Sequence, residues 1–409
     1  MNFLELIQKI NKKKKVLEYK DTSEYFDVEK NKIILEGILD KYNITLDDLN
    51  NDKVTFLERS LFQYEAVKSF ENKISLQKSI FYYFLKYPLV IYLLIFKKNK
   101  TFNVESDNIL ILHNNHQKNR ENVLPLNFKN FEPFSLENFT LNINDILFLI
   151  NIYKNINNKL YYSEFFIKVI YNIAKLSDVN ANFNNKNILN SFEYSFCSSV
   201  CTQYLNVKNN VHINIMHGEK LYYVRDSFSK FNEFYVWGKY YKDLFLKLGM
   251  ESSQFKVYTN PHFLELANIS SENSKKNMTL YWTPAFSIND ELILDLCKRF
   301  ESYNLCVRYH PSYYNLFLGE LEKISNSLKQ KIVIEDPNKV TIKESLRATD
   351  IVIGTYSTVM MEGYIAGKKL FFIEDKIINK IKHYYPIYKV DFLERNNVKK
   401  YVFNIRGEE

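Results

Sequence analysis

The sequence predicts an α/β protein in which a helical N-terminal region precedes two successive units of parallel sheet. From Asn108 onward, short apolar runs alternate with longer segments of helical period, which is the pattern of βαβ units. Residues 266–278 show no periodicity and are rich in Ser, Asn and Lys, so they form the expected linker between the units. A chain of 409 residues, 46% of them hydrophobic, is long enough to bury several cores.

Residues 1–105 are expected to be helical, because their apolar positions recur with helical spacing. The stretch 79–96 comes nearest to a membrane span, but Lys86 and Pro88 interrupt it, and a span needs about 20 uninterrupted apolar residues. We expect a buried helix followed by a strand there, with peripheral membrane contact as the alternative. The N-terminal lysines follow a short apolar segment, the reverse of a secretory signal. We therefore expect a cytoplasmic protein, with peripheral attachment at the inner membrane as the alternative.

The first α/β unit is expected over residues 106–265. Its apolar runs are short enough for buried strands, and its periodic segments are long enough for crossover helices. The expected strands lie at 108–112, 211–216, 233–238 and 255–259, and the expected helices lie at 144–156, 162–176, 193–206 and 239–249.

The second unit, residues 279–385, is more regular, and the tail 386–409 shows no clear pattern. Five strands joined by four helices predict an open, doubly wound parallel sheet. The expected strands lie at 278–284, 305–311, 331–336, 351–355 and 369–373, and the expected helices lie at 289–302, 314–329, 341–350 and 357–367.

The charge of the chain favours anionic partners. The net charge of +8 suits nucleotide sugars or a membrane surface, and no recognition motif supports nucleic acid. The sequence contains no GxGxxG, no GxxxxGK and no convincing pair of aspartates in a loop, so neither a dinucleotide nor a metal-held diphosphate is indicated. We expect a single phosphate held without a metal ion, and no further cofactor.

Polar residues follow several strands of the second unit, where doubly wound sheets bind their ligands. His310 and Pro311 end one expected strand, and Ser357 and Thr358 open the last expected helix. Free backbone N–H groups and hydroxyls at a helix start form an anion site, although for an isolated Ser-Thr pair a plain helix cap is the favoured interpretation. His310, at the end of a second strand, favours the phosphate site.

These residues carry a resemblance to a known family. "RYHP" followed by "GTYSTVMMEGYIAGK" resembles the donor-binding half of metal-independent GT-B glycosyltransferases of bacterial surface-polysaccharide synthesis, notably sialyltransferases and capsule Kdo transferases. The layout is also similar to that of CDP-glycerol polyol-phosphate transferases. The resemblance covers roughly residues 108 to 375 and implies a GT-B fold, in which two Rossmann-like domains face a cleft.

The resemblance also implies roles for individual residues. His310 and Pro311 would contact the phosphate of a CMP-activated sugar, and Ser357 and Thr358 would cradle it. Glu362 would bind the ribose, unless it is an exposed helix charge. The other donor-side residues are Thr283 and Pro284, which would line the pocket, and Glu335, which would border the cytosine through backbone groups.

The catalytic base is expected from the first unit, because inverting transfer needs a group that accepts the proton of the acceptor hydroxyl. "HGE" offers His217 and Glu219, and we favour Glu219 as the base and His217 as its neighbour or as a ligand of the acceptor. In the polyol-phosphate transferases that this chain resembles, the histidine before the glycine is the favoured base. Arg225 would hold an anionic group, and His113 and His116 are further acceptor-side candidates.

The expected function is therefore inverting transfer of a sialic-acid-like or Kdo-type sugar from a CMP-activated donor. The acceptor would be a glycan or glycolipid of the cell surface, such as capsule or lipooligosaccharide. Three alternatives stay open: a CDP-glycerol-type polyol-phosphate transferase, a non-hydrolysing epimerase that acts on UDP-sugars, and a non-catalytic nucleotide-binding scaffold.

Overall fold

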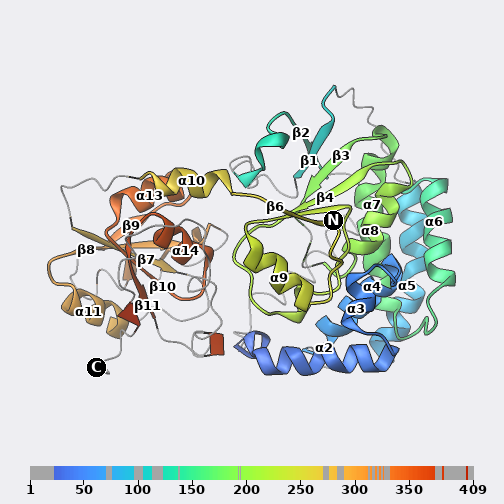
Figure 1. Ribbon diagram of the computed structural model, residues 1–409, viewed down its shortest axis with the longest axis horizontal. Helices are drawn as coiled ribbons and strands as arrows, with labels where there is room; N and C mark the ends of the chain where they lie inside the picture. The colour runs from blue at the N-terminus through green and yellow to red at the C-terminus, as the bar shows by residue number, and fades with distance from the viewer. Residues whose placement is uncertain are drawn as a thin grey trace.

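Figure 1 shows the computed structural model of the protein, in which two sheet-containing domains lie side by side along the longest axis. The structure describes residues 23–70, 76–95, 105–112, 123–136, 139–191, 193, 195–269, 276–282, 290–311, 332–373, 380–381 and 402–403, together with 314, 315, 318, 319, 322, 323 and 326.

The first domain is built on a parallel sheet with the strand order β2-β1-β3-β4-β5-β6. Its central strands are buried along most of their length, as expected for a sheet covered on both faces, although one of them includes the polar residues His212 and Asn214. The strands are β1 (Asn108–Leu112), β2 (Glu132–Ser135), β3 (Asn187–Asn190), β4 (Val211–Ile215), β5 (Glu233–Val236) and β6 (Phe255–Val257). The helices are η3 (Leu126–Phe128), α6 (Ile143–Lys154), α7 (Ser163–Asn182), α8 (Ser198–Asn206), η4 (Val224–Asp226) and α9 (Lys239–Lys247).

The N-terminal helices complete the first domain. They are η1 (Ser23–Phe26), α2 (Val28–Tyr42), α3 (Leu46–Asn50), α4 (Phe56–Lys68) and α5 (Leu76–Ile95). Thr45 and Thr55 form capping boxes that start α3 and α4. Tyr64 of α4 and Leu93 of α5 share one hydrophobic cluster with Ile109 of β1. These helices therefore belong to the core of the sheet domain.

The expected helix followed by a strand at 79–96 is wrong, because α5 continues as one helix through Pro88. Beyond Pro88 the helix buries Leu89 and Leu93, which lie one turn apart on the face that packs against the first domain. Burial of this face offsets the backbone hydrogen bond that the proline removes. Much of the opposite side of α5 remains exposed.

The second domain is a parallel sheet with the strand order β12-β11-β10-β7-β8-β9, and with the first sheet it confirms the predicted α/β fold of two Rossmann-like domains. Its edge strand β12 comes from the predicted tail 386–409, which therefore contributes to the sheet. The strands are β7 (Asn277–Trp282), β8 (Asn304–Tyr309), β9 (Val333–Glu335), β10 (Ile351–Gly354), β11 (Lys369–Phe372) and β12 (Val402–Phe403), and the helices include α11 (Asp290–Arg299), α13 (Ile342–Ala348) and α14 (Thr358–Ile365).

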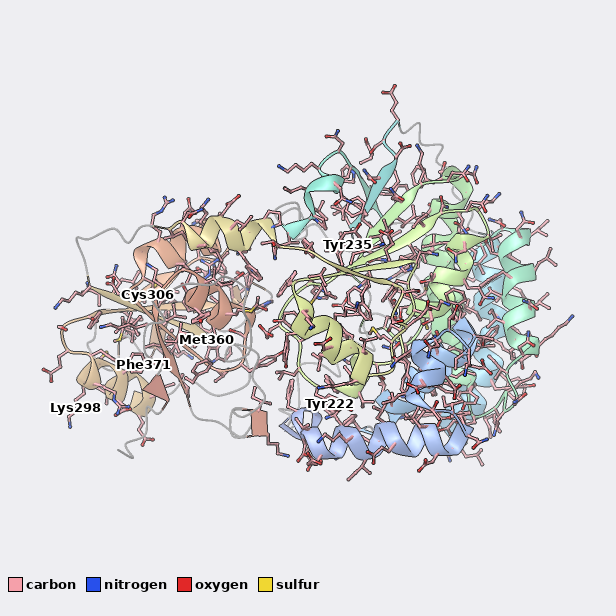
Figure 2. All side chains as sticks on the ribbon, viewed as in Figure 1. Tyr222, Tyr235, Lys298, Cys306, Met360 and Phe371 are labelled. Atoms are coloured by element: carbon pink, nitrogen blue, oxygen red, sulfur yellow. The ribbon has the colours of Figure 1, made fainter. Side chains whose placement is uncertain are left out.

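The two domains share a hydrophobic contact. Met360 of α14, labelled in Figure 2, belongs to the same buried cluster as Trp237 and Tyr241 of the first domain. Helix α10 (Pro261–Ala267) lies beside α14 at this junction. The predicted linker 266–278 overlaps the end of α10 and the start of β7. This packing brings the carboxyl ends of strands from both sheets together.

Candidate functional site

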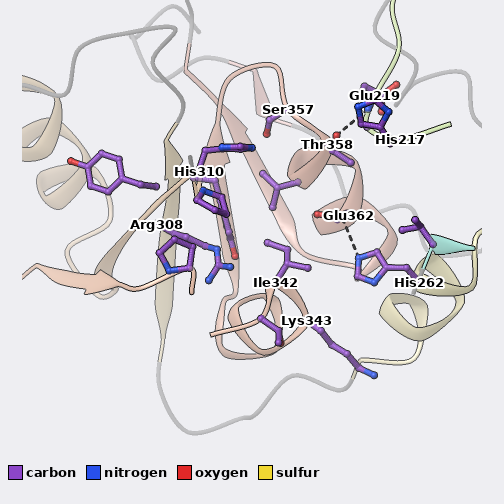
Figure 3. A pocket seen from close by; sticks show the side chains of 18 of the residues that line it. His217, Glu219, His262, Arg308, His310, Ile342, Lys343, Ser357, Thr358 and Glu362 are labelled. Atoms are coloured by element: carbon purple, nitrogen blue, oxygen red, sulfur yellow. Dashed lines mark hydrogen bonds and ion pairs between the residues drawn. The ribbon is translucent and has the colours of Figure 1, made fainter. Parts of the chain in front are cut away.

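A cavity of ≈ 710 Å³ lies at the junction of the domains. Residues that follow β4 in the first domain line it together with residues that follow β8 and β10 in the second (Figure 3). Of the residues predicted from the sequence, the structure brings together His217, Glu219, His310, Pro311, Ser357, Thr358 and Glu362 in the lining of this cavity.

His217 lies on a tight turn directly after β4. Gly218 adopts a φ of +68°, a left-handed conformation that glycine accepts without strain. The imidazole Nδ1 of His217 lies 3.0 Å from Oε1 of Glu193, and the His217 side chain is 32% exposed. One edge of the ring therefore faces a carboxylate, while part of the side chain stays accessible from the cavity.

Glu193 is fully buried and was not predicted from the sequence. Its Oε1 also lies 2.7 Å from Nζ of Lys220, and its Oε2 accepts a hydrogen bond of 3.0 Å from Nδ2 of Asn214. Burial alone would raise the pKa of Glu193, but the charge of Lys220 and the contact with His217 hold that pKa well below its usual value. Glu193 is therefore a fixed negative charge behind His217.

Glu219 is tied into the domain junction. Its backbone N–H donates to Oγ1 of Thr358 over 2.9 Å, and its carbonyl accepts from the hydroxyl of Tyr356 over 2.9 Å. The hydroxyl of Tyr241 donates to its carboxyl Oε1 over 2.7 Å, and Oε2 is buried without a partner among the residues that the structure describes. Burial raises the pKa of Glu219 to about 7. The residue fixes the turn that carries His217.

On the opposite wall, His310 follows β8 and Ser357 occupies the N-cap position of α14 (Figure 3). The backbone N–H of His310 donates to the carbonyl of Trp282 over 3.1 Å, which continues the pairing of β7 with β8. The His310 ring is exposed towards the cavity, and the first turn of α14 directs its free N–H groups to the same region. This wall offers donors to an anion.

Arg308 is a cavity residue that the sequence did not single out, although it belongs to "RYHP". Its guanidinium pairs with Glu335 and donates through Nη2 to the carbonyl of Val340 over 2.9 Å. Glu335 is itself absent from the described lining of the cavity, and its carboxylate is engaged by Arg308. The backbone role predicted for Glu335 stays a prediction.

Two side-chain contacts lie along the side of the cavity near α10. Oε1 of Glu362 lies 3.1 Å from Nε2 of His262 (Figure 3). Nζ of Lys343 lies 2.8 Å from an oxygen of Glu265. Both pairs join α10 to helices of the second domain. His262 was missed from the sequence, because its distance from Glu362 along the chain hides the contact.

The remaining predicted residues lie elsewhere. Arg225 pairs with Asp226 over 2.9 Å and stacks on Tyr223 at 4.5 Å from the ring centroid, and it is not among the described residues that line the cavity. Four predicted residues, His113, His116, Thr283 and Pro284, lie outside the described residues. Within the described ranges, no group of three or more His, Cys, Asp or Glu side chains is placed to hold a metal ion.

Comparisons with known proteins give structural similarities only. No family model matches the chain, and no curated protein matches it. Anabaena HepE in complex with UDP and glucose is similar with a TM-score of 0.38 and 10% identity, over 67% of this chain and 82% of that chain. Staphylococcus aureus MnaA with UDP has a TM-score of 0.43 and 13% identity, over 67% of this chain and 81% of that chain.

The wall teichoic acid polymerase TagF is similar with a TM-score of 0.35 and 14% identity, over 79% of this chain and 72% of that chain. A variant of TagF matches with a TM-score of 0.29 and 15% identity, over 40% of this chain and half the length of that chain. The two parallel sheets of the present chain define its fold independently of these similarities.

Proposed function

We propose that this chain is an inverting glycosyltransferase of the GT-B type. It would transfer a sialic-acid-like or Kdo-type sugar from a CMP-activated donor to a hydroxyl of a cell-surface glycan or glycolipid, such as capsule or lipooligosaccharide. One observation carries the proposal: the pair of His217 and Glu193 and the anion-binding wall of His310 and Ser357 line the same cavity between two Rossmann-like domains.

The second domain binds the donor in this proposal. The N–H groups at the start of α14, the hydroxyl of Ser357 and the ring of His310 would hold the phosphate of CMP. These groups stabilise the negative charge that develops on the phosphate as the sugar leaves, so no metal ion is required. Arg308 lies on the same wall, where its guanidinium pairs with Glu335.

His217 is the general base in this account. In this proposal the carboxylate of Glu193 accepts a hydrogen bond from the N–H at Nδ1 of His217, so Nε2 is the unprotonated nitrogen that takes the proton of the acceptor hydroxyl. The acceptor oxygen forms a bond to the anomeric carbon as the bond from that carbon to the phosphate oxygen breaks, and CMP leaves with that electron pair. Glu193 then stabilises the imidazolium ion.

Glu219 is less suited to this role than the sequence suggested. Its Oε1 is engaged by Tyr241 and its Oε2 is enclosed by protein, so an acceptor hydroxyl has no direct access to either oxygen. We assign Glu219 to positioning, because its backbone links the turn at His217 to Thr358 and Tyr356 of the second domain.

Polyol-phosphate transfer from CDP-glycerol is a second candidate, supported by the placement of a histidine before Gly218 with a carboxylate behind it. In that reaction the acceptor oxygen would attack the β-phosphorus, and the phosphoanhydride bond would break. CMP would again be the leaving group. The two candidates therefore share a nucleotide product and differ in whether the acceptor gains phosphorus.

We propose a cytoplasmic location, with peripheral attachment at the inner membrane as the alternative. The free cysteines of the chain fit a reducing compartment, and the candidate acceptors belong to the cell surface.

The test is a product assay. The full chain is incubated with a CMP-sialic acid, with CMP-Kdo or with CDP-glycerol, in the presence of oligosaccharide acceptors, and both CMP release and the acceptor product are measured. We expect CMP release from a CMP-sugar and a product that contains the sugar without added phosphorus. Turnover of CDP-glycerol alone, with phosphorus in the product, would replace the first candidate by the second. Nucleotide binding without any turnover would indicate a scaffold.

A further inference from the structure

Helices α5 and α6 present two exposed apolar stripes at the end of the molecule remote from the second domain (Figure 1). On α5, Phe81, Phe84 and Ile91 are 61%, 62% and 57% exposed. On α6, Ile143 and Leu147 are 76% and 60% exposed. Within each stripe the exposed positions recur every three or four residues, so each helix presents one continuous face. An apolar surface of this kind marks an interaction site.

The exposed charges on these two helices have a single sign. Helix α5 contains no Asp or Glu, and the one acidic residue of α6, Asp145, is buried and accepts hydrogen bonds from Tyr204 and Ser177, each of 2.6 Å. Lys78 and Lys154 are the exposed charged residues of the two helices. The sequence directly after α5 continues with further lysines. The surface therefore combines apolar side chains with positive charge.

The length and composition of α5 would allow it to cross a membrane, but one face of the helix packs against the first domain. Leu89 and Leu93 are buried on one side. The amino group of Lys86 lies 3.7 Å from the ring centroid of Tyr83 and 4.1 Å from that of Tyr153 on α6. Because one face of α5 packs against the domain, a partner can contact only the opposite, exposed face of the helix.

We propose that the exposed stripes of α5 and α6 bind the surface of an anionic lipid bilayer. The apolar side chains would enter the boundary between headgroups and acyl chains, and Lys78 and Lys154 would contact anionic headgroups. This inference goes beyond the proposed function and does not depend on it, because its test measures binding to lipid.

A second copy of the chain fits this surface less well. In a two-fold symmetric contact each patch meets its own copy, so the lysines of one patch would face the equally positive patch of the other. The exposed residues of the two helices include no carboxylate that could pair with them. An anionic bilayer carries charge opposite to that of the exposed Lys78 and Lys154.

The experiment is co-sedimentation of the full chain with vesicles of phosphatidylcholine alone and with vesicles that also contain phosphatidylglycerol. The variant Phe84→Ser/Ile91→Ser removes two side chains of the α5 stripe. The matched control, Leu126→Ser/Val257→Ser, removes two side chains of the same domain that are 62% and 54% exposed and lie outside the stripes. The variant Lys78→Gln/Lys154→Gln tests the charge. Thermal unfolding and light scattering report the fold and the oligomeric state of each protein.

We expect the wild type and the control to bind the anionic vesicles, and the apolar-stripe variant to bind at least about tenfold more weakly with an unchanged unfolding midpoint. The lysine variant should lose the preference for anionic over neutral vesicles. Absence of vesicle binding by the wild type, or equal binding by the apolar-stripe variant, would overturn the proposal. A wild-type dimer that binds no vesicles and is dissociated by Phe84→Ser/Ile91→Ser would assign the surface to a second copy.

Discussion

The Nδ1 atom of His217 lies 3.0 Å from Oε1 of Glu193, a carboxylate that is fully buried at the cavity end of the first sheet. Glu193 follows β3 and His217 follows β4, and these strands are parallel neighbours. The carboxyl ends of such strands lie at the same sheet edge, so the two side chains meet although they are far apart in sequence. A buried carboxylate behind an accessible imidazole is an arrangement suited to a general base.

Replacement of His217 should separate catalysis from donor binding. His217→Ala should lower kcat by about 10²-fold or more while CMP affinity stays within a small factor of the wild type, because a general base acts in the chemical step. Glu219→Gln should cost less than His217→Ala. Steady-state kinetics with CMP titrations check both variants, and the reverse order of losses would return the role of base to Glu219.

Glu193 should matter for both stability and turnover. Glu193→Gln leaves the buried amino group of Lys220 without its nearest carboxylate, and loss of one partner of a buried pair costs about 3–5 kcal/mol. The double variant Glu193→Gln/Lys220→Met removes both charges and should recover much of the unfolding free energy. It should not recover kcat, because His217 still lacks its carboxylate. Recovery of kcat together with stability would show that Glu193 has only a structural role.

The buried carboxyl of Glu219 should make stability depend on pH. Its pKa of about 7 in the folded protein lies above the usual value of 4.5, so the folded state binds more protons than the unfolded state between these values. The free energy of unfolding should therefore fall as pH rises from about 4.5 to 7, by about 3 kcal/mol from this residue. Urea unfolding of the wild type and of Glu219→Gln should show the variant gaining relative stability at pH 8 compared with pH 5. A constant difference would contradict the account.

The reaction should not require a divalent ion. The proposed phosphate site consists of helix N–H groups, Ser357 and His310, which donate hydrogen bonds, and the N-terminus of α14 adds positive potential without a metal. Turnover should therefore persist in excess EDTA. Loss of turnover with the chelator, restored by magnesium or manganese, would point to a metal-held diphosphate donor instead.

The strands and helices with strong patterns were predictable from the sequence. The runs "VHINI" and "IVIG" became β4 and β10, because Val and Ile are β-branched residues that favour strands. In β4 these residues alternate with His212 and Asn214, which are also buried. The short strand β3, Asn187–Asn190, was missed because Asn residues at both of its ends leave only two apolar positions between them. Glu193 was consequently assigned to a helix and not to a sheet edge.

The site residues also fall into those that a local sequence pattern marks and those that only contacts between distant elements reveal. His217 and His310 were found because each ends an apolar strand, and the structure brings both to one cavity. The contacts of Glu193 with His217 and of His262 with Glu362 connect residues on different elements, which no local pattern encodes. Pro88 misled the prediction for α5, since the packing of Leu89 and Leu93 outweighs the local preference of proline.

The most direct test of the proposed donor site is a thermal-shift comparison of CMP, CDP, UMP, UDP and GDP on the wild type and on His310→Ala. A ligand that binds only the folded state stabilises it by mass action, so the nucleotide that fits the cavity gives the largest shift. We predict the largest shift with a cytidine nucleotide, and at least about tenfold weaker binding of CMP to a folded His310→Ala variant, because a charge-assisted contact to phosphate contributes about 1.5–3 kcal/mol. A clearly larger shift with UDP or GDP, or CMP affinity unchanged by His310→Ala, would contradict the account.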